Sequence, residues 1–399
     1  MIWGKKQQPA EACCPHGIPR EKQCGSCLIE AHREQIDTRM LEQRKEIFEG
    51  EKVEGDFEYA WQVKRGEKRE HLEQGQDMVL VDEKRKMTAV FDGLGGEGDS
   101  ESGARASSLA AELLPEYYDR VLEYVKTKAT SEDAADMIHN QIRLPENHPQ
   151  YASLMEEGLK EFFAQPKEVQ IAMLTMHRAI QELNPAVLKS GGQTTISAGI
   201  TVELPDGRVF EIIGHLGDGG VVKVEEDGTA TELVAEDSAI DLLLTLGEIT
   251  PEQAKNPEFV YQGTKEQLKG KNIRELGRIT TQSLGDPSMI PMPRVVATEL
   301  KPGQSCVFVT DGQKDEIVDK EGNFDTKKIG KMVYESETPS EACKKINNEA
   351  SKGPKRDDKG IVVLSRKVSS EEIETAEETE EEPEEISAED LEEIKEEAA

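Results

Sequence analysis

Three short stretches of the sequence place an aspartate beside glycine at the end of an apolar run. They are Phe91-Asp92-Gly93, Leu216-Gly217-Asp218 and Thr310-Asp311-Gly312, and a weaker fourth, Asp357-Asp358, stands just before the run IVVLS. A carboxylate at a strand end is held rigidly, and the neighbouring glycine lets a metal ion, a water or a phosphate approach the backbone. Hard oxygen ligands of this kind suit Mg²⁺ or Mn²⁺. The repeated pattern therefore predicts a site for hard divalent cations.

An Asp-Gly pair is also a common turn, and this reading applies to two other pairs in the chain. Asp206-Gly207 follows Pro205, and Asp227-Gly228 lies between two strand-like runs. We interpret both pairs as turns.

A second group of ligand types lies near the start of the chain. Cys14-Pro15-His16 is followed by seven residues and then by Cys24-Gly25-Ser26-Cys27. Four soft ligands in one compact loop suit tetrahedral structural zinc, and this interpretation is favoured over free thiols. A thioredoxin-like redox role is disfavoured because no βαβ pattern surrounds Cys24 and Cys27.

The elements that would position these residues fall into separate groups of strands and helices. Short strands are predicted at 78–82 and 87–91, where they form a hairpin, and helices over 131–186. Residues 194–234 are predicted to form an antiparallel meander, followed by strands at 294–300, 305–309 and 361–365 and a helix near 338–351. A helix beginning near 107 is allowed a break at Pro115. The pattern predicts an α+β fold with packed antiparallel sheets.

Composition divides the chain into three parts. Residues 1–56 are expected to form a zinc-knuckle-like segment and a helical appendage, 57–367 the main domain, and 368–399 a disordered tail. Residues 371–399 contain sixteen Asp and Glu against one Lys, so nearly half of the net charge of −32 lies there. Such a tail cannot bury enough apolar area to offset its ordering entropy, although its end could form a helix on a protein partner.

A series of short motifs, taken in their order along the chain, resembles the motifs of the type 2C family of metal-dependent protein serine/threonine phosphatases, particularly its bacterial branch. The matching stretches are Phe91-Asp92-Gly93-Leu94-Gly95-Gly96, Gly192-Gln193-Thr194-Thr195, Leu216-Gly217-Asp218, Glu236-Asp237-Ser238, Arg278-Ile279-Thr280-Thr281-Gln282-Ser283-Leu284-Gly285, Thr310-Asp311-Gly312 and Asp357-Asp358. The resemblance covers about residues 57–367.

The resemblance implies an α-β-β-α sandwich of two antiparallel sheets flanked by helices, with metal ions in a cleft at one end of the sheets. It implies that Asp92 bridges two Mg²⁺ or Mn²⁺ ions and that Gly93 binds one through its carbonyl. Asp311 and Asp357 would complete the coordination of one of these ions, and Asp218 would help to hold a third, more weakly bound ion. Asp77 matches a further acidic position of the family. Two such ions activate a water for in-line displacement on phosphoserine or phosphothreonine of a protein substrate.

The sequence departs from the family pattern at several positions. Gln76 stands where many members have Glu, and Leu94 replaces a His of some relatives. Gly219-Gly220 replaces Ser-Arg, and Gly360 replaces a usual Thr. The phosphate-binding arginine is expected a few residues before Asp77, where Arg69 is the candidate and His71 lies at closer spacing.

Charge and hydropathy exclude several partner classes. The acidic balance argues against a nucleic-acid or anionic-membrane surface, which would need clustered Lys and Arg. The sequence has no apolar run approaching the length of a membrane span and no signal-peptide pattern at its start, so a cytoplasmic protein is expected.

Two other functions compete with the phosphatase. The first is a pseudophosphatase, a binding or regulatory module on the same fold in which Gln76, Gly219 and Gly220 reflect weakened metal binding. The second is an acidic scaffold that binds no ions, whose melting temperature Mn²⁺ would leave unchanged.

Overall fold

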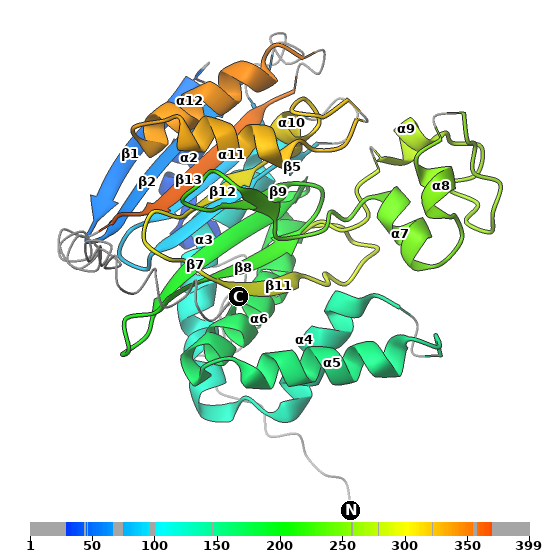
Figure 1. Ribbon diagram of the computed structural model, residues 1–399, viewed down its shortest axis with the longest axis horizontal. Helices are drawn as coiled ribbons and strands as arrows, with labels where there is room; N and C mark the ends of the chain where they lie inside the picture. The colour runs from blue at the N-terminus through cyan, green and yellow to red at the C-terminus, as the bar shows by residue number, and fades with distance from the viewer. Residues whose placement is uncertain are drawn as a thin grey trace, which may run out of the picture.

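Two antiparallel sheets pack face to face, and helices cover the outer face of each (Figure 1). This computed structural model describes residues 29–43, 45, 47–66, 75–95, 100–144, 147–256, 258–277, 279–320, 322–353 and 357–368. The layers confirm the predicted α-β-β-α sandwich. Within the described residues, no helix is long and apolar enough to cross a membrane.

The first sheet has six strands in the order β1-β2-β13-β12-β9-β10. Their bounds are β1 Ile47–Glu54, β2 Phe57–Lys64, β9 Gly220–Val224, β10 Ala230–Glu232, β12 Ser305–Val309 and β13 Lys359–Arg366. Alternate side chains of β13 serve two cores: Val362 and Leu364 face the other sheet, whereas Ile361 and Val363 face the helices. An apolar run such as IVVLS therefore belongs to a strand covered on both faces.

The second sheet has five strands in the order β11-β8-β7-β4-β3, with all neighbours antiparallel. Their bounds are β3 Met78–Asp82, β4 Met87–Phe91, β7 Ile196–Glu203, β8 Val209–Leu216 and β11 Arg294–Glu299. The β3–β4 pair confirms the predicted hairpin, and Gly207 and Gly228 have positive φ in the predicted turns. The predicted meander needs correction: β7 pairs with β8 and β9 pairs with β10, but the chain crosses from one sheet to the other between β8 and β9. A separate short pair joins β5 (Gly93–Leu94) to β6 (Gln193–Thr194).

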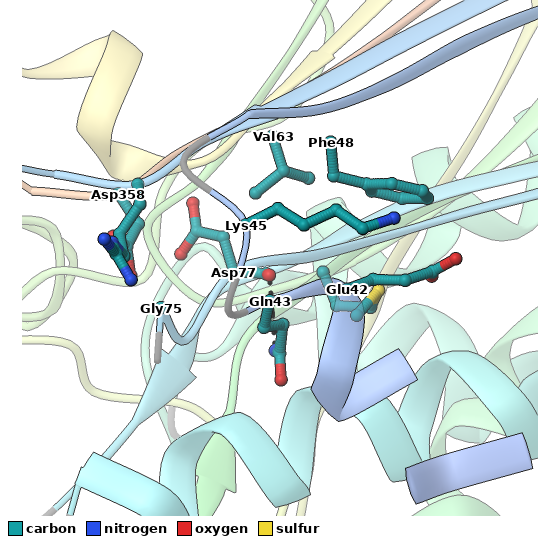
Figure 2. Close-up of a pocket in the computed structure, with 10 residues that line it drawn as sticks. Glu42, Gln43, Lys45, Phe48, Val63, Gly75, Asp77 and Asp358 are labelled. Atoms are coloured by element: carbon teal, nitrogen blue, oxygen red, sulfur yellow. Dashed lines mark hydrogen bonds between the residues drawn. The ribbon is translucent and has the colours of Figure 1, made fainter. Parts of the chain in front are cut away.

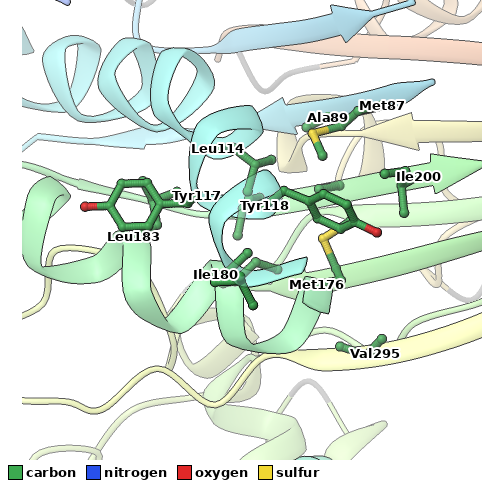
Figure 3. Packing of buried hydrophobic residues seen from close by; sticks show 14 of the residues in the cluster. Met87, Ala89, Leu114, Tyr117, Tyr118, Met176, Ile180, Leu183, Ile200 and Val295 are labelled. Atoms are coloured by element: carbon green, nitrogen blue, oxygen red, sulfur yellow. The ribbon is translucent and has the colours of Figure 1, made fainter. Parts of the chain in front are cut away.

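Helices α3, α4 and α6 cover the five-stranded sheet, and α2 and α5 pack on α3 and α4 respectively. Their bounds are α2 Arg33–Glu42, α3 Ser100–Lys128, α4 Ser131–Ile142, α5 Tyr151–Ala164 and α6 Lys167–Ser190. Leu114, Tyr118 and Ile180 meet Met87 and Ile200 of the sheet in the largest buried cluster (Figure 3). The permitted break at Pro115 is absent, because α3 runs through that residue without interruption.

The six-stranded sheet is covered by α11 (Thr326–Tyr334) and α12 (Pro339–Ala350), while the short α10 (Asp311–Lys314) follows β12. The helices α7 (Ala239–Thr245), α8 (Pro251–Ala254) and α9 (Ile273–Gly277) form a lobe beside the sandwich (Figure 1). This lobe has its own small core, which includes Leu243, Tyr261 and Leu276.

The expected boundary at residue 57 needs correction. The sequence predicts that the first 56 residues are an appendage, but β1 pairs along its whole length with β2 and so belongs to the six-stranded sheet. The helix α2 also packs on the sandwich, with Ile36 in the largest core. β1 was missed because it is an edge strand with mostly exposed, charged side chains, and such a strand shows no apolar alternation.

Candidate metal centre

The predicted aspartates come from both sheets and from the same end of the sandwich. Asp92 follows β4, Asp218 follows β8, and Asp311 follows β12. The register brings these ends together: Val90 pairs with Ser197 at the start of β7, Ile196 pairs with Leu216, and Val309 pairs with Ile361 at the start of β13. Asp77 precedes β3, whose first residue pairs with Phe91 at the end of β4.

Asp92 lies at the centre of this group. Its side chain is buried, and its pKa is raised well above the ordinary value by burial and by the charges of Asp311, Asp77 and Asp218. The backbone around it is fixed, because Thr195 N and Thr194 Oγ1 both donate to the Asp92 carbonyl at 2.9 Å. Four predicted ligand residues are therefore electrostatic neighbours.

Asp77 is buried as well, with 2% of its surface exposed. Burial raises its pKa well above the ordinary value, and the charges of Asp358, Asp311 and Asp357 add to the effect. One oxygen, Oδ2, accepts a hydrogen bond of 2.7 Å from Thr310 Oγ1, which opposes the rise. Thr310 therefore ties the start of β3 to the end of β12.

The adjacent Asp357 and Asp358 have different surroundings. Asp358 is buried, and its two carboxylate oxygens accept from the backbone amides of Gly66 and Gln76, each at 2.7 Å. Asp357 is partly exposed, and its charge raises the pKa of Asp77. Asp358 thus holds two backbone segments in place, and Asp357 remains the candidate ligand.

The glycine that follows Asp92 has a structural reason. A Cβ on Gly93 would lie 2.4 Å from the Gly103 carbonyl oxygen and 2.6 Å from that of Gln76. Gly93 N also donates to the Gln76 carbonyl at 3.2 Å. The chain after Asp92 therefore needs glycine because it runs directly against backbone.

Gln76, in the place of a family glutamate, contributes through its backbone. Its N–H binds Asp358, and its carbonyl accepts from Gly93 N and from Ser107 Oγ at 2.6 Å. The side chain of Gln43 donates to the same carbonyl at 3.3 Å. Gln76 therefore joins the segment that carries Asp92 and the segment that carries Asp358 to helix α3.

Lys314 lies against the Gly219-Gly220 pair. Its Nζ donates to the Gly219 carbonyl at 3.3 Å and lies 2.8 Å from Glu232 and 3.1 Å from Glu236. Burial lowers its pKa, but the two glutamates outweigh this and raise it. Its Cδ lies 3.5 Å from the position that a Cβ on Gly220 would take. This is an ordinary van der Waals separation, whereas a Cβ on Gly219 would lie 2.8 Å from the Val309 carbonyl oxygen, so Gly219 is the position that requires glycine.

Sequence reasoning missed two further cations near the cluster. Lys359 is buried and donates to the Asp357 carbonyl at 2.8 Å. Arg65 lines a small pocket together with Asp77 and Asp358. Lys45 and Phe48 line the side of this pocket away from Asp358 (Figure 2). The signal for Lys359 was its position next to Asp358, while Arg65 stands twelve residues before Asp77 with no motif of its own.

Several predicted site residues lie outside the described part of the chain. They are Arg69 and His71, the four zinc candidates Cys14, His16, Cys24 and Cys27, and the acidic tail. These predictions stay predictions.

The carboxylate cluster is not a closed cage. Among the described residues, no three His, Cys, Asp or Glu side chains are arranged around one ion-sized point. The buried, mutually repelling carboxylates nevertheless supply the hard oxygen donors that Mg²⁺ and Mn²⁺ prefer. The donor set therefore fits such cations.

No family model matches the chain. No curated protein matches it either.

Solved structures with a similar arrangement are serine/threonine phosphatases from bacteria. The Mycobacterium tuberculosis phosphatase PstP/Ppp is 18% identical, with 78% of this chain and 99% of that chain covered and a TM-score of 0.43. The Mycobacterium smegmatis PPM phosphatase MsPP, in complex with cacodylate, is 19% identical, with 77% and 97% covered and a TM-score of 0.43. The catalytic domain of PstP with two manganese ions is 17% identical, with 77% and 97% covered and a TM-score of 0.44. At these values the likeness does not by itself assign an activity to this chain.

Proposed function

We propose that this chain is a protein phosphatase that hydrolyses phosphoserine and phosphothreonine with a metal-activated water. The observation that carries the proposal is the convergence of Asp77, Asp92, Asp218, Asp311 and Asp357 from two sheets at one end of the sandwich. Folding a protein around repelling, buried carboxylates is costly unless cations neutralise them.

The residues divide into proposed roles by position. Asp92 is central and would be shared between two cations, with Asp311 and Asp357 on one side and Asp77 and the Gly93 carbonyl on the other. Asp218 is partly exposed and hydrogen-bonded by Thr280 Oγ1, which suits a third, weaker ion. Divalent cations bound here would lower the pKa of a water and neutralise charge on a phosphoryl group.

The other side chains fix this arrangement. Thr310 orients Asp77, Asp358 holds the backbone before β3, and the Thr194 and Thr195 contacts fix the Asp92 backbone. Arg69 remains the proposed phosphate-binding residue, and Arg65 is a second candidate because it lines the pocket beside Asp77. Such a guanidinium would hold two phosphate oxygens in a fork and orient the phosphorus for attack.

A second candidate function, the pseudophosphatase, is favoured by one observation. Gln76, Gly219 and Gly220 stand where the family pattern has Glu, Ser and Arg, and such substitutions would weaken metal binding. In this case phosphorylated proteins would be bound without turnover.

Three predictions from the sequence complete the proposal. Cys14, His16, Cys24 and Cys27 would hold a structural zinc ion that folds the first segment. The acidic tail would bind a protein partner, and the protein would reside in the cytoplasm.

The experiment is a phosphate-release assay on a phosphothreonine peptide with and without Mn²⁺. We expect metal-dependent release, reduced by at least about 100-fold in Asp92→Asn, since this change removes the central charged ligand. Asp206→Asn is the matched control, because Asp206 lies in an exposed turn away from the cluster, and its activity should equal that of wild type. Mn²⁺ binding and peptide capture without turnover would favour the pseudophosphatase instead.

A further inference from the structure

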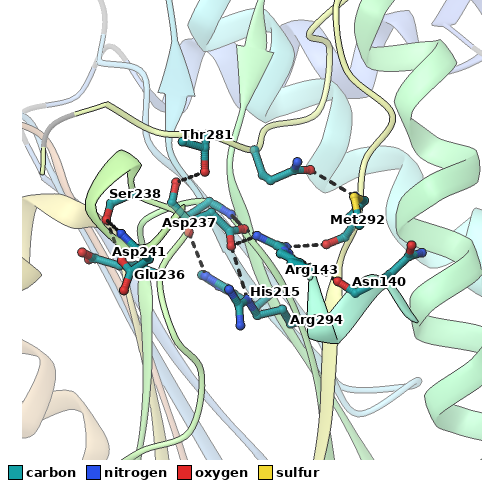
Figure 4. A network of polar contacts seen from close by, with 12 residues as sticks. Asn140, Arg143, His215, Glu236, Asp237, Ser238, Asp241, Thr281, Met292 and Arg294 are labelled. Carbon is teal, nitrogen blue, oxygen red and sulfur yellow. Dashed lines mark hydrogen bonds and ion pairs between the residues drawn. The ribbon is translucent and has the colours of Figure 1, made fainter. Parts of the chain in front are cut away.

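Asp237 is a buried carboxylate at the point where the chain enters the α7–α9 lobe. Its side chain is fully covered and is contacted by two arginines. Both terminal nitrogens of Arg143 donate to it, one to each oxygen, and Arg294 Nε donates to Oδ1 at 3.3 Å (Figure 4). A bidentate pair of this kind has a fixed geometry, so it positions the groups on both sides.

Arg143 anchors this group to the helical layer. It immediately follows α4 as the C-cap residue, and it has the left-handed φ of 55°. Besides Asp237 it donates to the Met292 carbonyl and to the Asn140 carbonyl, the latter at 3.3 Å. The ion pair therefore joins α4 to a loop 94 residues further along the chain.

The same carboxylate holds the loop that carries Asp218. Gly217 N donates to Asp237 Oδ2 at 2.9 Å, and the Gly217 carbonyl accepts from Asp237 N at 2.6 Å and from His215 Nε2 at 2.9 Å. Gly217 has φ +123°, and a Cβ there would lie 2.5 Å from Thr195. Because both polar backbone groups of Gly217 are bound, the direction of the next residue, Asp218, is fixed.

Asp237 also holds the exit of the lobe. Its carbonyl accepts from Thr281 N at 2.6 Å and from Thr281 Oγ1 at 2.8 Å. The preceding residue, Thr280, donates to Asp218. Thus α4, both ends of the lobe and the Asp218 loop meet at one buried charge.

We propose that Asp237, Arg143 and Arg294 form a positioning group that sets Asp218 in the metal centre and couples α4 to it. The effect of this group on metal affinity rests on the proposed function. Removing one arginine leaves the Asp237 charge under-compensated in a buried place, and the Gly217 backbone then loses its fixed partner. None of the three residues would touch the cations themselves.

The test compares full-length wild type with Arg143→Ala, Arg143→Lys and Asp237→Asn. Arg178→Ala is the matched control, since Arg178 also links α6 to α4, through Asp133 at 3.6 Å, but does not contact Asp237. Two quantities are measured: the exchange rate of the Gly217 amide hydrogen in metal-free protein, and the affinity for each Mn²⁺ in a titration followed by electron paramagnetic resonance.

We expect Gly217 amide exchange to become at least about tenfold faster in Arg143→Ala and Asp237→Asn, and part of the protection to return in Arg143→Lys. The weakest Mn²⁺ should bind about 10- to 100-fold less tightly, while the tighter ions change little. Arg178→Ala should match wild type in both measurements.

The outcomes separate this inference from the proposed function. If wild type binds Mn²⁺ but Arg143→Ala and Arg178→Ala give the same exchange rate and affinities, the positioning role is overturned and the phosphatase proposal is unaffected. If wild type binds no Mn²⁺, the metal centre fails. In that case faster Gly217 exchange in Arg143→Ala still supports the coupling, and unchanged exchange overturns it. If Asp237→Asn does not fold, the two Arg143 variants decide.

Discussion

At the scale of single residues, the neighbours Asp357 and Asp358 show that identical side chains can have different tasks. The resemblance to the phosphatase family predicts a metal ligand at this pair of aspartates. The hydrogen bonds in the structure show how the two side chains differ. Asp358 satisfies two distant backbone amides, whereas Asp357 is partly exposed and its side chain accepts from the adjacent Asp358 amide at 3.1 Å; the charges of both raise the pKa of Asp77.

Replacing each of these two residues by alanine should therefore give opposite results. Asp358→Ala leaves the Gly66 and Gln76 amides without their acceptor, so the free energy of unfolding of metal-free protein should fall by about 2–5 kcal/mol. Asp357→Ala should lower this free energy much less but weaken Mn²⁺ binding. Urea denaturation and a Mn²⁺ titration measure the two effects. Equal stability losses in both variants would contradict the division of roles.

Glu211 is a buried acid that the proposed chemistry does not use. Burial raises its pKa to about 8, although Thr201 Oγ1 donates to Oε2 at 2.8 Å and opposes the rise. Its other oxygen has no hydrogen-bond partner among the described residues, and the same is true of the Tyr59 hydroxyl, whose pKa the Glu211 charge helps to raise. Between the ordinary pKa of 4.5 and about 8, the folded chain keeps a proton that the unfolded chain has lost.

Glu211 should therefore make stability fall as pH rises through this window, and Glu211→Gln should remove this residue's part of the fall. At pH 8 we expect the variant to exceed wild type by about 3–5 kcal/mol in the free energy of unfolding, while the two converge near pH 4.5. Urea denaturation at pH 5 and pH 8.5 provides the comparison. Parallel pH profiles would show that Glu211 ionises normally in the folded protein.

At the scale of elements, the contact between β8 and α6 depends on a residue with no side chain. A Cβ on Gly214 would lie 2.5 Å from Met176 Cγ and 2.6 Å from Ile180 Cδ1. The helix can therefore approach the sheet closely only at glycine.

Gly214→Val should force this helix away from the sheet. Overpacking of this kind lowers the free energy of unfolding by about 1–3 kcal/mol or more. Thr231→Val on the exposed edge strand β10 is the control, with an expected change within about 0.5 kcal/mol. Thermal unfolding checks both variants, and a Gly214→Val protein as stable as wild type would show that α6 shifts at no cost.

Elements with a strong apolar pattern were predictable, and those without one were not. Strands β4, β12 and β13 are apolar runs because they are covered on both faces, so their existence and the aspartates at their ends, after β4 and β12 and before β13, could be read from the sequence. The edge strand β1 exposes most of its side chains, which removed the signal. Long-range pairs such as Arg143 with Asp237 leave no local pattern, since their partner is set by the fold.

At the scale of the whole molecule, the sandwich brings together acidic groups from a chain that is already strongly negative, with a net charge of −32. The raised pKa values of Asp77 and Asp92 mean that folded, metal-free protein holds protons that the unfolded chain releases above about pH 4. The stability of metal-free protein should therefore decline as pH rises above this value.

Divalent cations should reverse this decline. Mn²⁺ at about 100 times its dissociation constant should stabilise the folded chain by about 2.7 kcal/mol, and the melting temperature should rise accordingly. KCl at the same ionic strength should not replace it, because buried charges are poorly screened by salt. In Asp92→Asn the Mn²⁺-dependent rise should largely disappear, since the central ligand is gone. A melting temperature that Mn²⁺ leaves unchanged in wild type would instead identify an acidic scaffold without ions, and the carboxylates would then have to be held together by their protons alone.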